Sequence, residues 1–472
     1  MATKDSISAD EIALLHATQE SGASPLQLLL PGSHDYAKRR QLRDGAIGFD
    51  HIEPSAIAVP QDAGEVARLV QWATKIGLTF TIRGGGNDFW ARSIAHGALM
   101  IDMRDINRVG VAEDGKTATI GGGILMRDLI AGLGEAGLMT PTGTTWIIGY
   151  AGWMSNGGYG PYNHIYGMGI EQVVGAELVN AKGEQVVADQ DMLEGVRGLC
   201  GHLGIITALT VKVYPKHDIL AGILVFESSD IRRTLSQFFE ASPKLPMPEE
   251  LTIHHFVAYQ EQMRRTVFSV MWTWTGPDMD KGNETLQAWK NLTPPLLVST
   301  VSVQSEESRQ GQMPPPCPLR GGQRNCFLAR LPTPDAGDEL ASTILDAAET
   351  MPKMAGPNMA WGGMVAIDPA KMPPNCFIGK SHSYFSCSYQ HPDEEHAREV
   401  ISWTKSLIEK LQALDTSAVL DGSYPATNPP EKTAEELYGE RWGRVKELKT
   451  KYDPTNVFSH AYPKIDLGQS AL

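Results

Sequence analysis

Two glycine-rich stretches of this chain contain the residues that most clearly indicate a binding site. Pro141 to Gly160 reads PTGTTWIIGYAGWMSNGGYG, and Leu78 to Asp88 reads LTFTIRGGGND. Glycine has no Cβ, so it tolerates positive φ and lets the backbone approach a ligand closely. Successive bare N–H groups then form a concave site suited to a phosphate. Taken alone, each stretch also fits an ordinary structural turn.

The two stretches together favour an extended ligand with a pyrophosphate, such as FAD. Arg83 directly precedes the triple glycine, which places a cation beside the expected loop. Neither stretch has the GxGxxG spacing of a nicotinamide fingerprint, and no Gly-Lys-Ser/Thr of a P-loop follows. The pattern therefore indicates a backbone-lined anion site of another kind.

Hydrophobic periodicity predicts the elements that position these loops. We expect a strand at Ile57–Pro60, a helix capped by Asp62, and a strand at Leu78–Ile82 that delivers the chain into the first loop. The apolar run Leu26–Leu30 predicts a short helix. Further segments are expected to form a hairpin turned at Lys182-Gly183 (Val173–Asn180 with Glu184–Val187) and a helix near the C-terminus (Thr433–Lys451).

Size and composition narrow the class of protein. The 472 residues are too many for one ordinary core, and a net charge of -14 argues against a nucleic-acid or anionic-membrane partner. The five cysteines include no CxxC pair, so neither a zinc site nor a disulfide framework is indicated. The N-terminal segment has acidic residues and no apolar signal core, so a cytoplasmic location is expected.

Several motifs in order resemble one family. The chain is similar to berberine-bridge-enzyme-like FAD-linked oxidoreductases, a branch of the vanillyl-alcohol-oxidase superfamily with a PCMH-type FAD-binding domain. The motifs are IAVPQDAGEVARLVQWA (57–73), TIRGGGND (81–88), LMIDMRDIN (99–107), the stretch 141–160, YGMGIEQVVGAELVNAKGE (166–184), GHLGIITALTVKVYP (201–215) and KYDPTNVF (451–458).

The resemblance implies an α+β, two-domain flavoprotein. Residues 1–215 are expected to form the FAD-binding domain, with a PCMH-type core at about 50–215. Residues 216–421 are expected to form a substrate domain of antiparallel sheet and helices, and residues 422–472 to return to the FAD domain. The FAD-binding domain is thus bipartite.

The resemblance also implies which residues hold FAD. They are Arg83, Gly84, Gly85, Gly86, Asn87, Asp88, Thr142, Gly143, Thr144, Thr145, Gly149, Gly152, Trp153, Ser155, Asn156, Gly158, Tyr159, Ile205 and Ile206. Many members attach the flavin through a histidine and a cysteine, where this chain has Asn87 and Thr145. Neither side chain can form the usual link, so we expect non-covalent FAD and a weaker oxidant. No metal ligands are expected.

The catalytic base is less well marked. The family's Tyr-Val-Asn-Tyr motif is reduced here to Tyr424-Pro425-Ala426-Thr427, and the family's His-Arg pair is missing from Asn375–Lys380. Oxidation of a C–H or O–H bond calls for a proton acceptor. We expect Tyr424, Tyr384 or His255 in that role, and the wider set of candidates adds His254, Tyr259 and Tyr389.

These observations lead to one expected function and one alternative. The expected function is oxidation of a small organic substrate, of secondary-metabolite type by family analogy, with hydride transfer to FAD. Molecular oxygen or another acceptor would then take the electrons. The alternative is a non-redox isomerase or cyclase on the same fold, because both covalent anchors and part of the C-terminal motif are lost. A third interpretation, a flavin-binding scaffold without catalysis, has less support.

Overall fold

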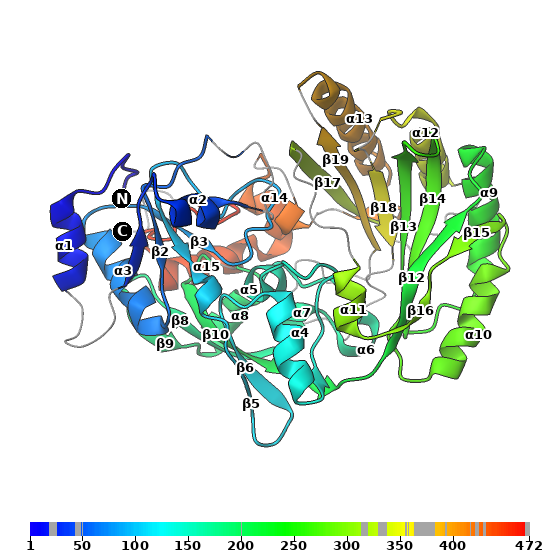
Figure 1. Cartoon of the computed structure of the whole chain (residues 1–472). Helices are drawn as coiled ribbons and strands as arrows, with labels where there is room; N and C mark the ends of the chain where they lie inside the picture. The colour runs from blue at the N-terminus through cyan, green and yellow to red at the C-terminus, as the bar shows by residue number, and fades with distance from the viewer. Residues whose placement is uncertain are drawn as a thin grey trace.

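The computed structural model describes residues 1–17, 26–42, 49, 51–199, 201–312, 320–328, 338–354, 356, 358–362, 383–391, 394–415, 417–420, 424–427 and 431–467. Figure 1 shows two lobes, one containing both termini and the other built around one large sheet. Asn375–Lys380, singled out above, lies outside the described residues. Over the part of the chain that is described, no helix combines the length and the apolar character that a membrane crossing needs.

A four-stranded sheet holds the first glycine stretch at one of its strand ends. Its order is β1-β2-β4-β3, with β2 and β3 both parallel to β4. The strands are β1 (Gln27–Leu29), β2 (Ala56–Val59), β3 (Phe80–Arg83) and β4 (Leu99–Asp102). Helix α3 (Ala63–Lys75) connects β2 to β3. Asp62 caps this helix, as predicted: its side chain accepts a hydrogen bond from the Glu65 N–H at 2.9 Å.

The N-terminal segment differs from the prediction. The expected helix at Leu26–Leu30 is wrong, because this run contains β1, which pairs antiparallel with β2. A run of five residues is too short for its apolar pattern to distinguish helix from strand. Helices α1 (Ala9–Ala17) and α2 (His34–Arg40) lie on either side of it in the sequence.

The second sheet of this lobe has five described strands, all antiparallel, in the order β5-β6-β10-β8-β9. The hairpin of β8 and β9 confirms its prediction, and Gly183 at its turn has φ +72°. A short ribbon pairs β7 with β11. The elements are β5 (Val109–Val111), β6 (Thr117–Gly121), β7 (Leu138–Met139), β8 (Val173–Val179), β9 (Gln185–Val187), β10 (Ile205–Lys212), β11 (Tyr214–Pro215), α4 (Met126–Glu135), α5 (Tyr150–Met154), α6 (Asn163–Tyr166), α7 (Gly169–Gln172) and α8 (Gln190–Val196).

The other lobe contains an antiparallel sheet with nine strands in the described ranges, in the order β15-β12-β14-β13-β18-β19-β17-β20, with β16 also on β12. This agrees with the antiparallel sheet and helices expected for this part of the chain. Its elements are β12 (Ile219–Phe226), β13 (Leu251–Gln260), β14 (Arg265–Trp274), β15 (Leu296–Ser299), β16 (Ser302–Gln304), β17 (Arg320–Leu328), β18 (Asn358–Gly362), β19 (Ser383–His391), β20 (Val419–Leu420), α9 (Ile231–Ala241), α10 (Met279–Lys290), α11 (Glu306–Gly311), α12 (Glu339–Thr350) and α13 (Glu394–Gln412).

The two faces of this large sheet have different partners. Helices α9, α10, α12 and α13 pack on one face through an apolar core that includes Trp272 and Trp361 (Figure 1). On the opposite face Phe327 and Tyr384 join the core of the first lobe, where they meet Tyr159. Side chains that alternate along β17 and β19 therefore either enter the helix-covered core or face the first lobe.

The C-terminal segment packs on the first lobe. The helix expected at Thr433–Lys451 is interrupted: α14 (Ala434–Tyr438) ends at Gly439, whose φ is +48°, and α15 (Trp442–Tyr452) follows. Arg444 of α15 pairs with Asp191 and Glu194 of α8 at 2.8 and 2.7 Å. The expected boundaries at residues 215 and 421 stay predictions.

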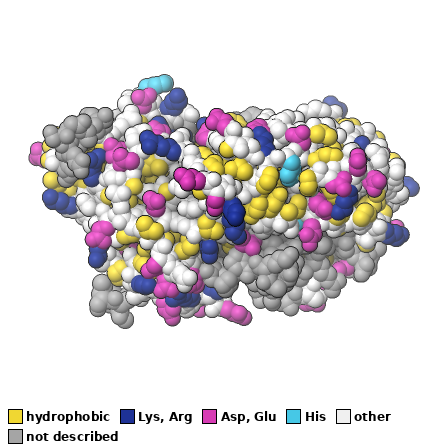
Figure 2. Space-filling view, turned by 90° about the horizontal axis from the view of Figure 1, so that it is seen from below, with side chains coloured by type: hydrophobic (Ala, Val, Ile, Leu, Met, Phe, Trp, Pro, Cys, Tyr) yellow, Lys and Arg dark blue, Asp and Glu magenta, His cyan; other side chains and the backbone are white. Residues whose placement is uncertain are grey.

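Charged side chains of both signs lie on the same face of the molecule. Figure 2 shows acidic and basic side chains interspersed over the face seen from below. The excess of negative charge therefore forms no continuous single-sign field on this face, which would be needed to attract a polyelectrolyte strongly.

Candidate functional site

A cavity of about 600 Å³ lies between the two glycine stretches, the C-terminal segment and the large sheet. Small-molecule sites typically occupy this range of volumes. The predicted FAD-binding residues that line it are Gly84, Gly85, Gly86, Asn87, Asp88, Gly143, Thr144, Thr145, Gly149, Gly152, Trp153, Asn156, Tyr159 and Ile206. Two of the three predicted catalytic residues, Tyr384 and Tyr424, also line it.

Glycine is required for different reasons at different positions of the two stretches. A Cβ on Gly85 would lie 2.5 Å from the Gly149 nitrogen and 2.7 Å from the Ile147 oxygen, so the two loops touch backbone to backbone here. A Cβ on Gly84 or Gly152 would meet no atom within 4 Å. These two positions leave open space at the cavity, as a cradle for a ligand's phosphates requires. The lining therefore fits an extended anion such as FAD.

Arg83 does not lie beside the cavity, contrary to the prediction. Its guanidinium is buried and turns behind the loop, where it donates to the backbone oxygens of Arg39 and Gln41. Burial, and then the nearby Arg104, lower the pKa of Arg83 to about 9. The cation adjacent to the glycines in the sequence is thus a support for the loop rather than a part of the cavity wall.

Four further predicted residues do not reach the cavity lining. The Ser155 hydroxyl donates to the Ala151 oxygen at 2.5 Å, and a Cβ on Gly158 would lie 2.5 Å from the Gly169 Cα. Ile205 is fully buried in the core of the first sheet, whereas the next residue of the strand, Ile206, lines the cavity. The fourth is Thr142.

Thr142 belongs instead to a buried polar network that joins the two lobes. Its hydroxyl donates to Glu306 Oε1 of α11 at 3.2 Å. Gln310 Nε2 donates to the same oxygen at 2.9 Å and to the Gly143 oxygen at 3.1 Å, and Arg309 Nε donates to Glu306 Oε2 at 2.8 Å. We call Glu306, Arg309 and Gln310 the α11 clamp. It fixes the start of the second glycine stretch, and no local sequence signal marks it.

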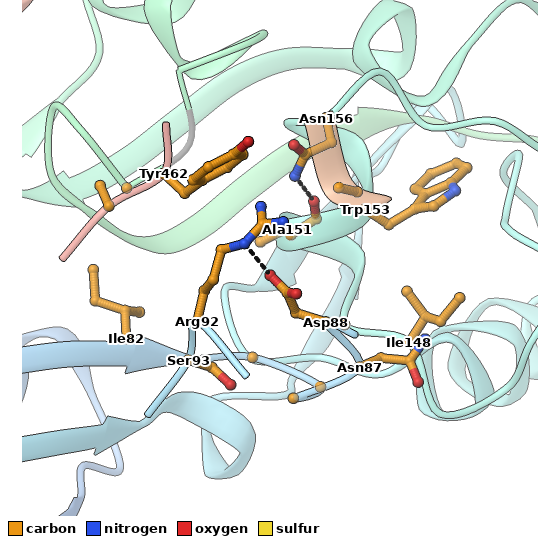
Figure 3. A pocket seen from close by; sticks show the side chains of 18 of the residues that line it. Ile82, Asn87, Asp88, Arg92, Ser93, Ile148, Ala151, Trp153, Asn156 and Tyr462 are labelled. Carbon is orange, nitrogen blue, oxygen red and sulfur yellow. Dashed lines mark hydrogen bonds and ion pairs between the residues drawn. The ribbon is translucent and has the colours of Figure 1, made fainter. Parts of the chain in front are cut away.

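The charged pair in the cavity wall was not anticipated from the sequence. Arg92 Nε lies 3.3 Å from Asp88 Oδ2, and its guanidinium stacks 3.6 Å from the centre of the Tyr462 ring (Figure 3). Phe458, His460 and Tyr462 line the cavity from the C-terminal segment. The KYDPTNVF motif signalled that segment, although the motif itself ends at Phe458.

A buried ion pair holds this C-terminal segment in place. Asp453 accepts from the Val457 and Phe458 N–H groups at 2.7 and 3.0 Å, and pairs with the buried Lys449 of α15. The turn before Phe458 is therefore fixed by one aspartate, which also accounts for the Asp-Pro-x-Asn signal in the sequence.

Tyrosine rings form the part of the cavity wall nearest the large sheet. Tyr159 and Tyr384 lie nearly parallel with ring centres 6.1 Å apart, and Tyr424 meets Tyr159 edge-on at 5.0 Å. Gln323 Nε2 donates to the Tyr384 hydroxyl at 3.0 Å. Burial, and then the neighbouring Tyr384, raise the pKa of Tyr424 well above its usual value. Tyr424 is therefore a neutral phenol at neutral pH.

The prediction of His255 as a catalytic base is wrong. His255 lies on the helix-covered face of β13, where its ring stacks on Trp361 with centres 5.1 Å apart and Nδ1 lies 3.0 Å from the Trp361 oxygen. Burial lowers the pKa of His255 to about 3. Of the wider set of candidates, His254, Tyr259 and Tyr389 are not among the residues that line the cavity.

Comparisons with known proteins find similar sequences for both the glycine-rich segment and the C-terminal segment of the site. Residues 54–189 match the FAD binding domain family, and residues 422–463 match the family described as berberine and berberine like. The FAD-linked oxidoreductase aurO of Gibberella zeae is 27% identical over 422 residues, which cover 88% of this chain and 81% of that protein.

Solved structures confirm the fold. The berberine-bridge-enzyme-like protein 1 of Physcomitrella patens superposes with a TM-score of 0.80 at 18% identity, covering 97% of this chain and 99% of that one. The glucooligosaccharide oxidase of Acremonium strictum, which has a 6-S-cysteinyl, 8α-N1-histidyl FAD, gives a TM-score of 0.76 at 16% identity, covering 92% and 95%. The glycine cavity, both family matches and a relative along most of the chain agree in supporting a similarity to the berberine-bridge-enzyme-like FAD-linked oxidoreductases.

Proposed function

We propose that this oxidoreductase holds FAD without a covalent bond and oxidises a small organic molecule, with molecular oxygen or another acceptor reoxidising the flavin. The observation that supports non-covalent binding is the pair Asn87 and Thr145. Both line the cavity at the positions where the resemblance puts histidine and cysteine. A carboxamide and a hydroxyl do not form the histidyl and cysteinyl bonds named for the Acremonium strictum enzyme.

The residues of the chain divide the work of binding. Bare backbone at Gly84 and Gly152 leaves room for the cofactor's phosphates, and backbone N–H groups supply hydrogen bonds there. Asp88 neutralises Arg92, which keeps that cation stacked on Tyr462. FAD, when bound, supplies the redox chemistry, because a flavin accepts a hydride from an oxidisable substrate. The buried tyrosines exclude water from the other side of the cavity.

Denaturation tests the mode of binding. The protein, purified with its yellow cofactor, is precipitated with acid, and flavin absorbance is measured in the supernatant and in the washed pellet. We expect all flavin in the supernatant. Flavin that remains with the polypeptide after washing in denaturant would refute non-covalent binding.

A non-redox isomerase or cyclase is the second candidate function. The observation that favours it is the neutral phenol of Tyr424, a proton donor rather than a base, in the cavity wall. Anaerobic mixing with a converted substrate distinguishes the two functions. Bleaching of the flavin absorbance with one product per flavin indicates oxidation, whereas many turnovers without bleaching indicate the non-redox reaction.

A further inference from the structure

A second, smaller cavity adjoins the C-terminal segment on the side away from the large cavity. Its volume is about 160 Å³. One water needs about 10–15 Å³ and a drug-sized ligand about 300–1,000 Å³, so this cavity suits a molecule of a few heavy atoms. The residues that line it are His202, Asn456, Phe458, Ser459, Ala461, Lys464, Ile465 and Asp466. We call this cavity the tail pocket.

A buried histidine in the tail pocket has ring nitrogens without hydrogen-bond partners. His202 is 2% exposed, and neither ring nitrogen forms a hydrogen bond within the described part of the chain. Burial, and then the Lys449 ammonium, lower the pKa of His202 to about 3, while the nearby Tyr462 backbone raises it. The ring is therefore a neutral imidazole with one N–H donor and one acceptor nitrogen. Burying such a group unpaired costs free energy, which a polar ligand in the pocket would recover.

The lysine of the tail pocket keeps donors for a ligand. Lys464 donates to the Ser459 backbone oxygen, and an ammonium group has further N–H donors beyond that one. Burial, and then the neighbouring Lys449, lower the pKa of Lys464. Lys449 itself is neutralised by its buried ion pair with Asp453. No carboxylate in the described ranges forms such a pair with Lys464, so an anion in the pocket would stabilise its charge.

An acidic residue in the same lining distinguishes among anions. An ionised carboxylate such as that of Asp466 only accepts hydrogen bonds. It would repel sulfate, which carries no proton near neutral pH, but it can accept from the P–OH group of a protonated phosphate. Lys464 supplies donors, and the Asn456 amide can donate or accept. The lining thus fits an oxyanion that has both acceptor oxygens and a hydroxyl.

The tail pocket and the large cavity share a wall. Phe458 and Ala461 line both of them, and His460 lies between these two residues and lines the large cavity. Burial, and then Lys464, lower the pKa of His460, so the charge in the tail pocket acts on the cavity. An anion beside Lys464 would offset this effect and raise the pKa of His460.

We propose that the tail pocket binds a small phosphate, either free or as a small monoester, with Lys464 and His202 donating to it and Asp466 accepting its proton. This site is separate from the large cavity, and the proposed oxidation uses none of its three polar residues. The size of the pocket and the donors and acceptors of its lining carry the proposal.

Calorimetric titration of the flavin-loaded protein tests the proposal. FAD occupies the glycine loops in this sample, so added phosphate does not report on the cofactor's own phosphate site. Inorganic phosphate, sulfate and glycerol 3-phosphate are compared near neutral pH in chloride buffer. We expect phosphate to bind at least about 10-fold more tightly than sulfate, the worth of one charge-assisted hydrogen bond. Phosphate that binds no more tightly than sulfate would overturn the proposal. Comparable binding of glycerol 3-phosphate assigns the pocket to monoesters, and weaker binding assigns it to free phosphate.

Variants locate the bound phosphate. Lys464→Met should weaken phosphate binding about 10-fold or more. Lys116→Met is the matched control: it removes the same charge from an exposed position between β5 and β6, outside the tail pocket, and should bind phosphate as the wild type does. Equal phosphate affinities of the two lysine variants would refute the site. Asp466→Asn should bring the affinities for sulfate and phosphate together, and an unchanged preference would refute the role of Asp466.

Two further measurements exclude a merely structural role. His202→Phe removes both unpartnered nitrogens and keeps a ring, so it should weaken phosphate binding without lowering the thermal unfolding temperature in phosphate-free buffer. A lower unfolding temperature with unchanged phosphate affinity would show that His202 only packs. The pKa of His460, followed by NMR, should rise when phosphate is added to the wild type but not to Lys464→Met. No rise in the wild type would refute the placement of phosphate beside Lys464.

Discussion

Valine substitutions at Gly84 and Gly85 test which of these glycines leaves room for a cofactor and which leaves room for the protein's own backbone. Gly84 and Gly85 are neighbours in the first glycine stretch, and both line the cavity. A Cβ on Gly84 would meet no atom within 4 Å, whereas a Cβ on Gly85 would lie 2.5 Å from the Gly149 nitrogen. Valine at Gly85 should therefore lower the stability of the fold, whereas valine at Gly84 should leave stability nearly unchanged and weaken FAD binding.

The contacts set the size of each effect. At Gly85 the obstacle is the backbone of Ile147 and Gly149, which no rotamer change can relieve. Overpacking of this kind costs about 1–3 kcal/mol of unfolding free energy. Gly84→Val meets open space and should change stability by roughly 0.5 kcal/mol or less. Its isopropyl group would displace a phosphate from one charge-assisted hydrogen bond, worth about 1.5–3 kcal/mol. FAD affinity should then fall roughly 10- to 150-fold.

Two measurements on flavin-free protein distinguish these effects. Thermal unfolding by circular dichroism gives stability, and titration with FAD, followed by quenching of flavin fluorescence, gives affinity. Gly443→Val on the exposed surface of α15 is the matched control, because an added Cβ there also meets nothing within 4 Å. The control should bind FAD and unfold as the wild type does.

Either of two results would contradict these expected effects. If Gly84→Val binds FAD as tightly as Gly443→Val does, the open space at Gly84 is not where the phosphates lie. If Gly85→Val unfolds like the wild type, the contact between the two glycine loops is not the reason for glycine at position 85. The packing of Gly85 against Gly149 thus gives this glycine a structural reason that the sequence did not indicate.

Three other predictions test separate parts of the structure. Gln310→Leu removes the donor to the Gly143 oxygen and should weaken FAD binding several-fold in a titration, whereas Gln312→Leu on the exposed end of the same helix should not; equal affinities would refute a positioning role for the α11 clamp. Asn87→His should shift the flavin spectrum or potential and yield partial covalent attachment; an unchanged spectrum, potential and affinity would mean that position 87 does not contact the flavin. The pKa of the buried His255 is about 3 in the folded protein, against about 6.5 in the unfolded chain. Between these two pH values the unfolded chain therefore binds a proton at His255 that the folded protein does not bind. Stability falls from pH 6.5 towards 3 by about 1.36 kcal/mol per unit for this group, and His255→Phe should flatten that slope in urea unfolding curves; an unchanged slope would contradict the pKa of His255.

The local sequence was sufficient to predict the structure of short segments whose conformation depends only on neighbouring residues. The Asp62 cap, the β8–β9 hairpin with Gly183 at positive φ, and both glycine stretches were predicted from a few neighbouring residues. The resemblance to a family then placed two stretches far apart in the sequence at one site. Most of the lining of the cavity by these two stretches was therefore predictable.

Sequence was insufficient where a side chain's direction depends on distant strands. Along β13 the residues from Leu251 to His255 are all buried, so alternation does not indicate which face meets the cavity. His255 consequently looked equivalent to a cavity residue, although it packs on Trp361. Gln323 lies next to Tyr384 only because β17 pairs with β19 across a long separation in the chain. No local pattern contains that register.

The position of Arg83 changes the electrostatic interpretation of the first glycine loop. Gly86 has φ +69°, and a Cβ there would lie 2.8 Å from Arg83 Nε, so this glycine makes room for the guanidinium behind the loop. Arg39 and Arg104 lie in the same cluster and share Asp102, at 3.2 and 2.6 Å. Arg83 itself donates to backbone oxygens, and among the described residues no carboxylate forms an ion pair with it.

A buried positive charge behind a loop acts on whatever binds in front of it. In a medium of low polarity such a charge is weakly screened, and it raises the potential at the N–H groups that face the cavity. An anion on the loop would offset the cost of burying Arg83, while direct contact would block the close approach of phosphate to backbone that glycine permits. The arginine that precedes the glycines in the sequence would therefore favour a phosphate bound in front of the loop, and Gly86 makes room for the guanidinium behind it.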